Sequence, residues 1–154
     1  MSEEGMRVAK PEDCEELSRL RATLWPRSSV GEHARELQAI LSGEETGNAT
    51  VVIFVWATRD GSLAGFVETR QRSHADECDE SQPVGYVEGW FVRSECRRKG
   101  IGAALVRAAE DWARGQGCKE MASDAEIENE ASQRAHEALG FVAVSRVVNY
   151  QKTL

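Results

Sequence analysis

The segment from Tyr86 to Ala113 contains an apolar strand, a basic glycine-containing loop and an amphipathic helix, in that order. After the loop, apolar residues recur every three or four positions, which predicts a helix with one buried face. These residues are Ile101, Ala104, Leu105, Ala108, Ala109, Trp112 and Ala113. The start of such a helix presents free backbone N–H groups at the positive end of the helix dipole. The segment therefore predicts an anion site where the strand leads into the helix.

The loop has the side chains that an anion site needs. Arg97, Arg98 and Lys99 supply positive charge, and Gly100 and Gly102 have no Cβ to keep an anion from the backbone. We expect the ligand to be a pyrophosphate. A dinucleotide fold would place G-x-G-x-x-G after its first strand, so the late position of this loop argues against that fold. The alternative is an ordinary helix whose first turn happens to be basic.

The spacing Arg97-x-x-Gly100-x-Gly102 resembles the acyl-CoA loop of the GNAT superfamily of N-acetyltransferases, whose motif is Q/R-x-x-G-x-G/A. The resemblance covers essentially the whole chain and is closest to the aminoglycoside 6'-N-acetyltransferases. It is carried by separate blocks in the right order. They are Leu24-Trp25-Pro26, residues 83–92, Ala122-Ser123-Asp124-Ala125-Glu126, Ser132-Gln133-x-Ala135-His136 and Leu139-Gly140-Phe141.

Length and charge bound the functions open to the chain. Its 154 residues suffice for one domain, and we expect residues 1–154 to form it. A formal net charge of −7 argues against nucleic acid as a partner and favours cationic ligands. No apolar run is long enough to span a membrane, and the acidic N-terminus does not resemble a signal peptide, so we expect a cytoplasmic protein. The four cysteines form no C-x-x-C pair, so we expect reduced thiols and no metal site.

The predicted order of elements is β-α-α-β-β-β-α-β-α-β-β. We expect strands at 6–9, 50–57, 63–70, 83–92, 120–123, 141–144 and 146–152, and helices at 11–24, 32–42, from 101 to a stop at 115, and at 129–139. The strands before and after the long helix are joined by a crossover and should be parallel. This is an α/β fold with a mixed sheet. The GNAT resemblance implies a mostly antiparallel sheet with flanking helices and this parallel crossover at the acyl-CoA site.

Glu88 is a candidate for the chemistry because it lies in the middle of an apolar strand. Alternation places it on one face with Tyr86, Trp90 and Val92. A carboxylate in such a strand needs a partner. The partner is either an internal arginine, which is a structural role, or a substrate ammonium whose proton Glu88 helps to remove. The resemblance implies that Glu88 faces the aminoglycoside.

Asp124 and Trp25 are the other candidates for substrate binding. Asp124 ends a strand, where parallel strands of open sheets line a ligand crevice, although Asp also suits a turn cap. Trp25 alone suggests core packing. The resemblance implies that Asp124 contacts substrate amines and that Trp25 forms a wall of the antibiotic pocket, where an aromatic face can lie beside an ammonium.

Two positions near the last helix are more ambiguous. Asn129 is placed to cap that helix, and family members also use such an Asn to contact the cofactor. His136 stands where many GNAT enzymes have a Tyr proposed to protonate the leaving CoA thiolate. His can act as a general acid as well, but a helix-surface or cofactor-packing role is an equal alternative. Ser145 is a second departure, since relatives often have Glu there. We expect His33 and His74 to lie on the surface.

The resemblance implies direct acetyl transfer from acetyl-CoA to an aminoglycoside amine. The implied cofactor-binding residues are Trp90, Phe91, Val92, Arg97, Arg98, Lys99, Gly100, Ile101, Gly102, Ala103 and Asn129. Two alternatives remain open: a GNAT enzyme that acetylates another polyamine or a protein amine, and an acyl-CoA-binding sensor without turnover. We also expect a homodimer in which the last strand pairs across a two-fold axis.

Overall fold

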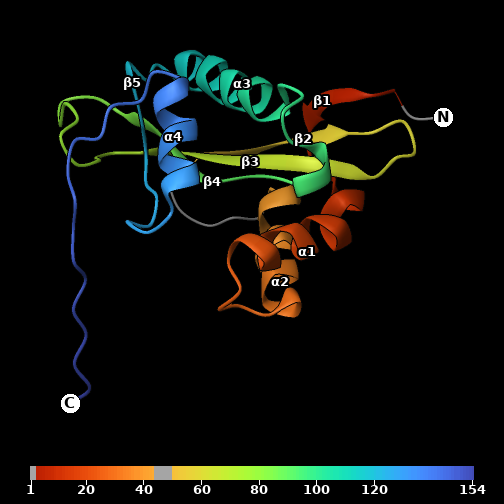
Figure 1. Ribbon diagram of the computed structural model, residues 1–154, viewed down its shortest axis with the longest axis horizontal. Helices are drawn as coiled ribbons and strands as arrows, with labels where there is room; N and C mark the ends of the chain where they lie inside the picture. Colours follow the sequence, from red (N-terminus) through yellow and green to blue (C-terminus); the bar gives the residue numbers. More distant parts are fainter. Residues whose placement is uncertain (1–2, 44–49) are drawn as a thin grey trace.

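The computed structural model describes residues 3–43 and 50–154 (Figure 1). Its elements, in chain order, are β1 (Gly5–Val8), the 3₁₀ turn η1 (Pro11–Asp13), α1 (Cys14–Leu24), α2 (Val30–Leu41), β2 (Val51–Ala57), β3 (Leu63–Arg72), β4 (Val84–Val92), η2 (Ser94–Cys96), α3 (Ile101–Gly115), β5 (Glu120–Ser123) and α4 (Glu130–Ala138). The helices and strands predicted before residue 140 are confirmed, with ends that differ by one or two residues apart from the 3₁₀ start of the first helix. In this described part, no helix is long and apolar enough to cross a membrane.

The strands form one five-stranded sheet in the order β1-β2-β3-β4-β5. The first three pairings are antiparallel, whereas β4 and β5 pair in parallel, from Val84 opposite Glu120 to Val87 opposite Ser123. α3 is the crossover that joins these two strands, as expected for a parallel connection. The predicted mixed sheet with a parallel crossover is confirmed.

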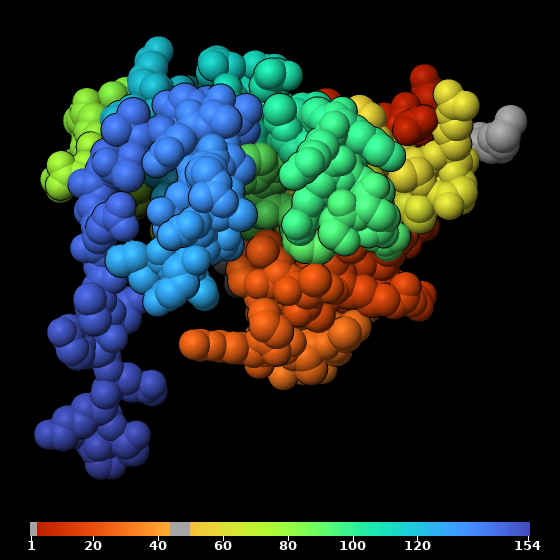
Figure 2. Space-filling model, in the orientation of Figure 1, coloured from red at the N-terminus to blue at the C-terminus, as the bar shows by residue number. Residues whose placement is uncertain are grey.

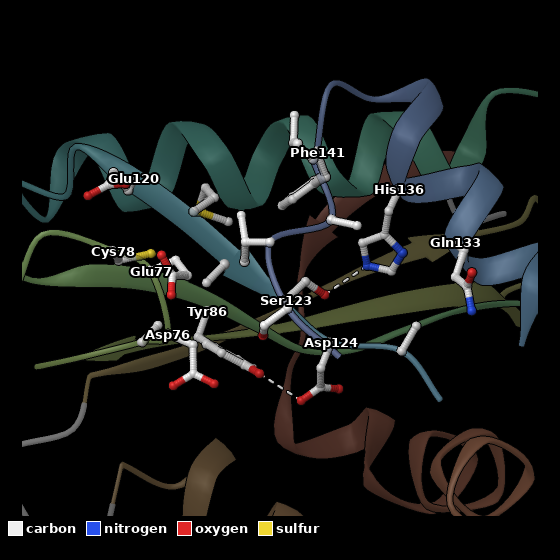
Figure 3. Close-up of a pocket in the computed structure, with 18 of the residues that line it drawn as sticks. Asp76, Glu77, Cys78, Tyr86, Glu120, Ser123, Asp124, Gln133, His136 and Phe141 are labelled. Atoms are coloured by element: carbon white, nitrogen blue, oxygen red, sulfur yellow. Dashed lines mark hydrogen bonds between the residues drawn. The ribbon is translucent and has the colours of Figure 1, made fainter. Parts of the chain in front are cut away.

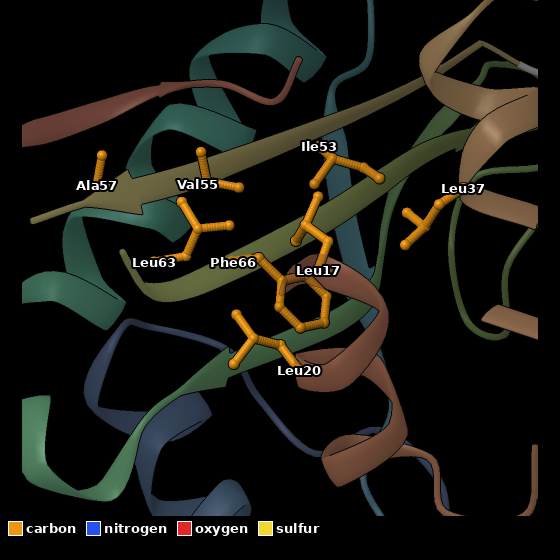
Figure 4. Packing of buried hydrophobic residues seen from close by; sticks show 8 residues of the cluster. All are labelled: Leu17, Leu20, Leu37, Ile53, Val55, Ala57, Leu63 and Phe66. Atoms are coloured by element: carbon orange, nitrogen blue, oxygen red, sulfur yellow. The ribbon is translucent and has the colours of Figure 1, made fainter. Parts of the chain in front are cut away.

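Helices cover both faces of the sheet, and each face has its own apolar cluster (Figure 1). α1 and α2 pack on one face through Leu17, Leu20, Leu37, Ile53, Val55, Ala57, Leu63 and Phe66, all buried (Figure 4). α3 packs on the other face through Ala64, Val67, Val87, Ile101, Leu105 and Ala109. The helical periodicity of α3 places its apolar residues on the face that meets the sheet. β3 contributes to both clusters, with Leu63 and Phe66 on one face and Ala64 and Val67 on the other, because its pairing with β2 shifts by one residue at Ala64. β3 and β4 are therefore held between two packed layers at the centre of the molecule.

The two strands predicted after α4, at 141–144 and 146–152, are absent. From residue 141 to 154 the chain forms no strand; it first runs along the body, where residues 141–147 line a groove, and its C-terminal end then extends away as a tail (Figures 1 and 2). Its large apolar side chains are exposed, with Val148 at 74% and Tyr150 at 92%. The β-branched and aromatic residues favour a strand, but a strand also needs hydrogen bonds to a neighbouring strand. Within residues 3–43 and 50–154, no strand pairs with this segment.

The predicted alternation along β4 is also wrong. The pairing of β3 with β4 shifts by one residue, so that Glu68 lies opposite Gly89 while Thr69 lies opposite Val87. Glu88 is the extra residue at this bulge, which reverses the phase of the strand. Trp90 and Val92 therefore pack toward the α3 cluster together with Val87, instead of sharing a face with Glu88. β4 pairs with β3 on one side and with β5 on the other, so the bulge lies in an inner strand of the sheet, next to the edge strand β5.

Candidate functional site

The loop before α3 has the backbone conformation of a tight turn into a helix. Gly100 is the residue before the helix and is left-handed, with φ of +79°, a conformation that favours glycine. The first helical bond runs from the N–H of Ala104 to the carbonyl of Gly100, at 3.0 Å. The N–H groups of residues 101–103 therefore precede the helical bonding pattern and are available at the end of the helix dipole. This geometry is that of the predicted anion site.

Gly102 allows close packing between the loop and β4. A Cβ at this position would lie 3.2 Å from the indole of Trp90. The absence of a side chain thus lets the first turn of α3 lie against β4. The indole nitrogen of Trp90 is buried and has no hydrogen-bond partner. The contact sets the distance between the loop and the strand that the sequence analysis assigned to acyl-CoA.

The three basic residues of the loop are not equivalent. Arg97 donates from Nε to the carbonyl of Val92 at 2.8 Å, and its guanidinium lies 5.9 Å from the ring of Phe91. It therefore ties the loop to the end of β4. Arg98 and Lys99 are exposed, and Arg98 has a positive φ of 63°. Arg97 is exposed as well, but its guanidinium is bound to β4 through Val92.

β4 continues beyond the end of β5. Their pairing ends where Val87 lies opposite Ser123, so the described chain places no strand beside residues 88–92 on that side. Phe91 packs on the α1 and α2 cluster, while Trp90 and Val92 pack on the α3 cluster. Unpaired strand backbone beside a helix N-terminus is a fitting surface for an extended, phosphate-bearing molecule.

A groove of about 1040 Å³ opens along β5 and α4. Figure 3 shows Asp124, Ser123, His136 and the acidic loop residues Asp76 and Glu77 among the side chains around it. Both strands of the parallel pair contribute, because Tyr86 of β4 also lines the groove. Its far wall comes from residues 139–147, which include Ser145. Several carboxylates thus surround one space, as a polycationic ligand requires.

Asp124 lies just beyond the carboxyl end of β5 and is exposed to the groove, as predicted. It accepts a hydrogen bond of 2.6 Å from the Tyr86 hydroxyl (Figure 3). Burial and this hydrogen bond raise the pKa of Tyr86, so the phenol keeps its proton and remains a donor. One carboxylate oxygen is held by Tyr86, which fixes the orientation of the group.

Glu88 has the internal partner that the sequence analysis left open. Arg72 donates to it through a two-pronged contact, from Nε at 2.9 Å and from Nη2 at 2.7 Å. The Nε of Arg70 lies 3.9 Å from the same carboxylate. The Arg72 guanidinium also lies 3.5 Å from the centre of the Tyr86 ring. Glu88, Arg72, Tyr86 and Asp124 therefore form one connected polar chain.

Trp25 lies against the same part of β4. A Cβ at Gly89 would come within 2.5 Å of the indole ring, so only glycine allows this contact. The ring is also in contact with Arg21, whose guanidinium is 5.0 Å from the ring centre, and is stacked on His33 at 6.2 Å. His33 is buried, contrary to the surface position expected, and one of its ring nitrogens lies 3.1 Å from the Trp25 carbonyl. Trp25 is thus fixed in place beside the Glu88 bulge.

His136 lies between α4 and β5 and contacts both. Its Nδ1 is 2.7 Å from the carbonyl of Ser132, and its Nε2 is 2.8 Å from the hydroxyl of Ser123 (Figure 3). The ring also makes edge contacts with Trp90 and Phe141, each at 5.3 Å between centres. The Ser132 hydroxyl also lies 3.3 Å from Nδ1. A carbonyl can only accept, so the shorter contact with the Ser132 carbonyl favours the tautomer with hydrogen on Nδ1, in which Nε2 accepts from the Ser123 hydroxyl.

Asn129 has the capping role predicted for it. Its side-chain oxygen accepts from the N–H of Ser132 at 3.0 Å, which satisfies the first turn of α4. It is exposed and lies outside the residues that line the groove. Within residues 3–43 and 50–154, no group of His, Cys, Asp and Glu is arranged to hold a metal ion.

The sequence analysis missed Arg72 and Ser123 as members of the site. Arg72 belongs to the run Arg70-Gln71-Arg72, which ends β3. A strand that ends in two arginines beside a strand that contains Glu88 is a signal for an ion pair, but only once the pairing of the strands is known. Ser123 precedes Asp124 and resembled an ordinary strand residue. Its role depends on α4, which brings His136 to it from another part of the chain.

Comparison with known proteins agrees with this geometry. The Acetyltransferase (GNAT) family model matches residues 14–141. An aminoglycoside N(6')-acetyltransferase type 1 of Klebsiella aerogenes is 45% identical over 135 residues, which cover 88% of this chain and 87% of that protein. A protein of the same name from Serratia marcescens is 40% identical over 136 residues, with 88% and 89% of the two chains covered.

Solved structures of such enzymes have the same fold. The aminoglycoside N-acetyltransferase AAC(6')-Iy in complex with CoA is 33% identical and gives a TM-score of 0.86, covering 100% of this chain and 97% of that chain. The same enzyme with the bisubstrate analogue CoA-S-monomethyl-acetylneamine is also 33% identical and gives a TM-score of 0.84, with 99% and 100% covered. The chain therefore belongs to the GNAT family of acetyltransferases, in which these aminoglycoside N(6')-acetyltransferases are its relatives.

Proposed function

We propose that this protein transfers the acetyl group of acetyl-CoA to the 6'-amine of an aminoglycoside, and so confers resistance to the antibiotic. One observation carries the proposal: the chain has both a loop suited to a pyrophosphate, at the start of α3, and a groove lined by carboxylates, along β5 and α4. The relatives support it, since proteins named aminoglycoside N(6')-acetyltransferase are up to 45% identical to this chain. An aminoglycoside is a polycation, and the groove contains Asp76, Glu77 and Asp124.

In this proposal the α3 loop and β4 hold acetyl-CoA, which supplies a thioester as the acetyl donor. The N–H groups of residues 101–103 bind its pyrophosphate, and Arg98 and Lys99 add positive charge. The unpaired backbone of Trp90, Phe91 and Val92 aligns its pantetheine arm. A backbone N–H of this stretch stabilises negative charge on the reacting carbonyl oxygen.

The acceptor binds through carboxylates and an aromatic surface. Asp124 has an oxygen at the groove for a substrate ammonium, while its other contact, with Tyr86, fixes its position. Trp25 provides a rigid wall beside Glu88. The main contribution to rate is that both substrates are held together in one orientation. No protein nucleophile is needed, because a neutral amine attacks the thioester directly.

Protons move at two places in the proposed reaction. The acceptor amine must lose one, and Glu88 receives it through water once its carboxylate faces the substrate. The CoA sulfur must gain one as the carbon–sulfur bond breaks. In this proposal the Ser123 hydroxyl gives its proton to the sulfur, and the Nε2–H of His136 in its doubly protonated form replaces that proton on Ser123, with which Nε2 is in contact. His136 is left neutral.

The function is tested by mixing the purified protein with acetyl-CoA, an aminoglycoside and a thiol reagent. We expect CoA release with neomycin but little with paromomycin, which differs from neomycin in carrying a hydroxyl in place of the 6'-amine. Release with spermidine or a lysine peptide, and none with neomycin, would instead show a GNAT enzyme of another specificity. Tight CoA binding without release would show a sensor.

We further propose a cytoplasmic location. Cys14, Cys78, Cys96 and Cys118 are all free, which suits a reducing compartment. Acetyl-CoA, the proposed acetyl donor, is produced and consumed in that compartment.

We also propose that the protein is a homodimer and that the tail of each chain pairs with its partner. Support comes from two unsatisfied features: the exposed apolar tail and the outer edge of the sheet at β5. Residues 139–147 lie across the groove from β5, which leaves space beside that edge. A strand contributed by a second chain would cover both features.

The proposed dimer can be tested by a substitution in the tail. We expect the full chain to sediment as a dimer, and Val148→Asp to shift it toward a monomer, because a charge would have to be buried in the new contact. Val30→Asp is the control, since Val30 is also exposed but begins α2, far along the chain from the tail. A monomeric wild type at all concentrations would contradict the proposal.

A further inference from the structure

The guanidinium of Arg72 is held by groups that also suit a substrate ammonium. The Glu88 carboxylate accepts two hydrogen bonds from it, at 2.9 and 2.7 Å, and the Tyr86 ring lies 3.5 Å beneath it. A carboxylate and an aromatic face are the two surfaces that bind a protonated amine. Tyr86 in turn donates to Asp124, so the guanidinium belongs to the same polar chain as the proposed substrate carboxylate.

Arg72 differs from a structural arginine in its exposure. Its side chain is 40% exposed and lines the groove. Arg21 offers the contrast: its side chain is 6% exposed and lies between Glu36 and the buried Glu68. A long side chain at the rim of a groove can swing into water at little cost, whereas a buried one cannot. Arg72 is therefore held by its partners, not by packing.

In the protein without substrate, a cation beside Glu88 is stabilising. Glu88 is about four-fifths buried, with its side chain 19% exposed. A carboxylate that is largely removed from water is costly without a counter-charge. The hydrogen bonds that Arg72 donates to Glu88 raise the pKa of Arg72, so its guanidinium remains charged. Arg70 is the second cation near Glu88, but its Nε is 3.9 Å away, beyond hydrogen-bond distance.

From these contacts we propose that Arg72 occupies the position of a substrate ammonium in the free protein, and that an aminoglycoside binds by displacing it from Glu88. The inference rests on the proposed function, because it concerns the same acceptor site. It explains how Glu88 can have the internal partner of a structural residue and still act on substrate. It also makes Arg72 a residue that sets acceptor affinity, since only a ligand with an ammonium in the right place can replace the guanidinium.

The test is Arg72→Met, which keeps the aliphatic stem but removes the competing charge. We expect the aminoglycoside KM to fall by about 5- to 10-fold, because an ion pair and a cation–π contact no longer have to be broken. The KM for acetyl-CoA should stay within about 2-fold. Arg114→Met is the matched control: Arg114 lines the same groove and its ion pairs are within its own helix, to Glu110 and Asp111. An unchanged or higher aminoglycoside KM in Arg72→Met would overturn the proposal.

Calorimetry separates this inference from the proposed function. Tobramycin is titrated into the wild-type protein and into Arg72→Met, with no acetyl donor present. Tighter tobramycin binding by the variant supports the displacement of Arg72. If the wild type also releases no CoA with an aminoglycoside, that result counts against the proposed function and not against the displacement. Equal, weaker or undetectable binding by the variant overturns the displacement of Arg72. If Arg72→Met does not fold, Arg72→Lys answers the question, since it retains the charge but loses the two-pronged contact and should also bind more tightly.

Discussion

Replacing Asp124 with alanine should lower kcat/KM for an aminoglycoside by about 10- to 100-fold while the affinity for acetyl-CoA stays close to wild type. The size corresponds to one hydrogen bond to a charged group, of roughly 1.5–3 kcal/mol. Asp124 is exposed at the groove and lies just beyond the end of β5, whereas the predicted anion site is the loop before α3. Steady-state kinetics for the antibiotic and calorimetry for acetyl-CoA measure the two effects separately.

Two controls sharpen the Asp124 experiment. Asp111→Ala removes a carboxylate from the surface of α3, where it pairs with Arg114. It should change neither kcat/KM for the aminoglycoside nor the affinity for acetyl-CoA. Tyr86→Phe keeps the Asp124 charge but removes the hydrogen bond that orients it, so we expect a smaller loss than in Asp124→Ala. Parallel loss of antibiotic turnover and acetyl-CoA binding in Asp124→Ala would instead assign this residue to the stability of the fold.

Local patterns in the sequence predicted most of the fold because the signals and their consequences are close together along the chain. The apolar spacing of α3 needs only a sheet to pack against, and the sheet is made of strands with equally local signals. Capping is also local: Asn129 binds the N–H of a residue three positions away. The order of elements and the parallel crossover follow from such signals with general rules of connection.

The predictions of strands after α4 and of simple alternation along β4 were wrong for the same reason. Both features depend on how a strand pairs with a partner strand. Residues 141–152 have the composition of strands, but composition cannot say which edge will accept them. The bulge at Glu88 depends on how β3 and β4 are paired. One extra residue reverses every later position, so a simple alternation placed Trp90 and Val92 on the wrong face. Strand pairing is a long-range property that the local pattern does not contain.

In the candidate site, too, the features that depend on local sequence were predicted, and those that depend on strand pairing were not. Asp124, the loop before α3 and the capping role of Asn129 followed from position on an element, and the structure places them as expected. The partner of Glu88 could only be stated as two alternatives, because Arg72 is 16 residues away and meets it through strand pairing. The burial of His33 was missed, since nothing in a helix of mixed polarity shows that Trp25 will cover it.

The largest expected effect on stability comes from Arg21→Leu. Arg21 and Glu68 are both buried, and the ion pair between them is 3.7 Å long. Replacing Arg21 leaves the Glu68 carboxylate in a buried position without that counter-charge. Such a loss typically costs about 3–5 kcal/mol of the free energy of unfolding. Arg19→Leu is the control on the same helix: its partner is the exposed Glu15, so we expect a change of about 0.5 kcal/mol or less.

The pH dependence of the free energy of unfolding shows whether the loss of stability in Arg21→Leu comes from the buried charge of Glu68. Burial raises the pKa of Glu68 above its ordinary value of 4.5, while the charge of Arg21 lowers it. Removing Arg21 must therefore raise this pKa further. A carboxyl group whose pKa is higher in the folded than in the unfolded state stabilises the folded state when it is protonated. This stabilisation is lost as the pH rises from the pKa of the unfolded state through the pKa of the folded state.

Urea unfolding of Arg21→Leu should accordingly show a large deficit in stability at pH 8 that narrows as the pH is lowered and Glu68 takes up a proton. The double variant Arg21→Leu/Glu68→Leu should recover most of the stability at pH 8, because a buried ion pair replaced by apolar side chains is often neutral or better. A deficit in Arg21→Leu that is independent of pH and persists in the double variant would mean that Arg21 acts through packing on Trp25, 5.0 Å away, and not through its charge.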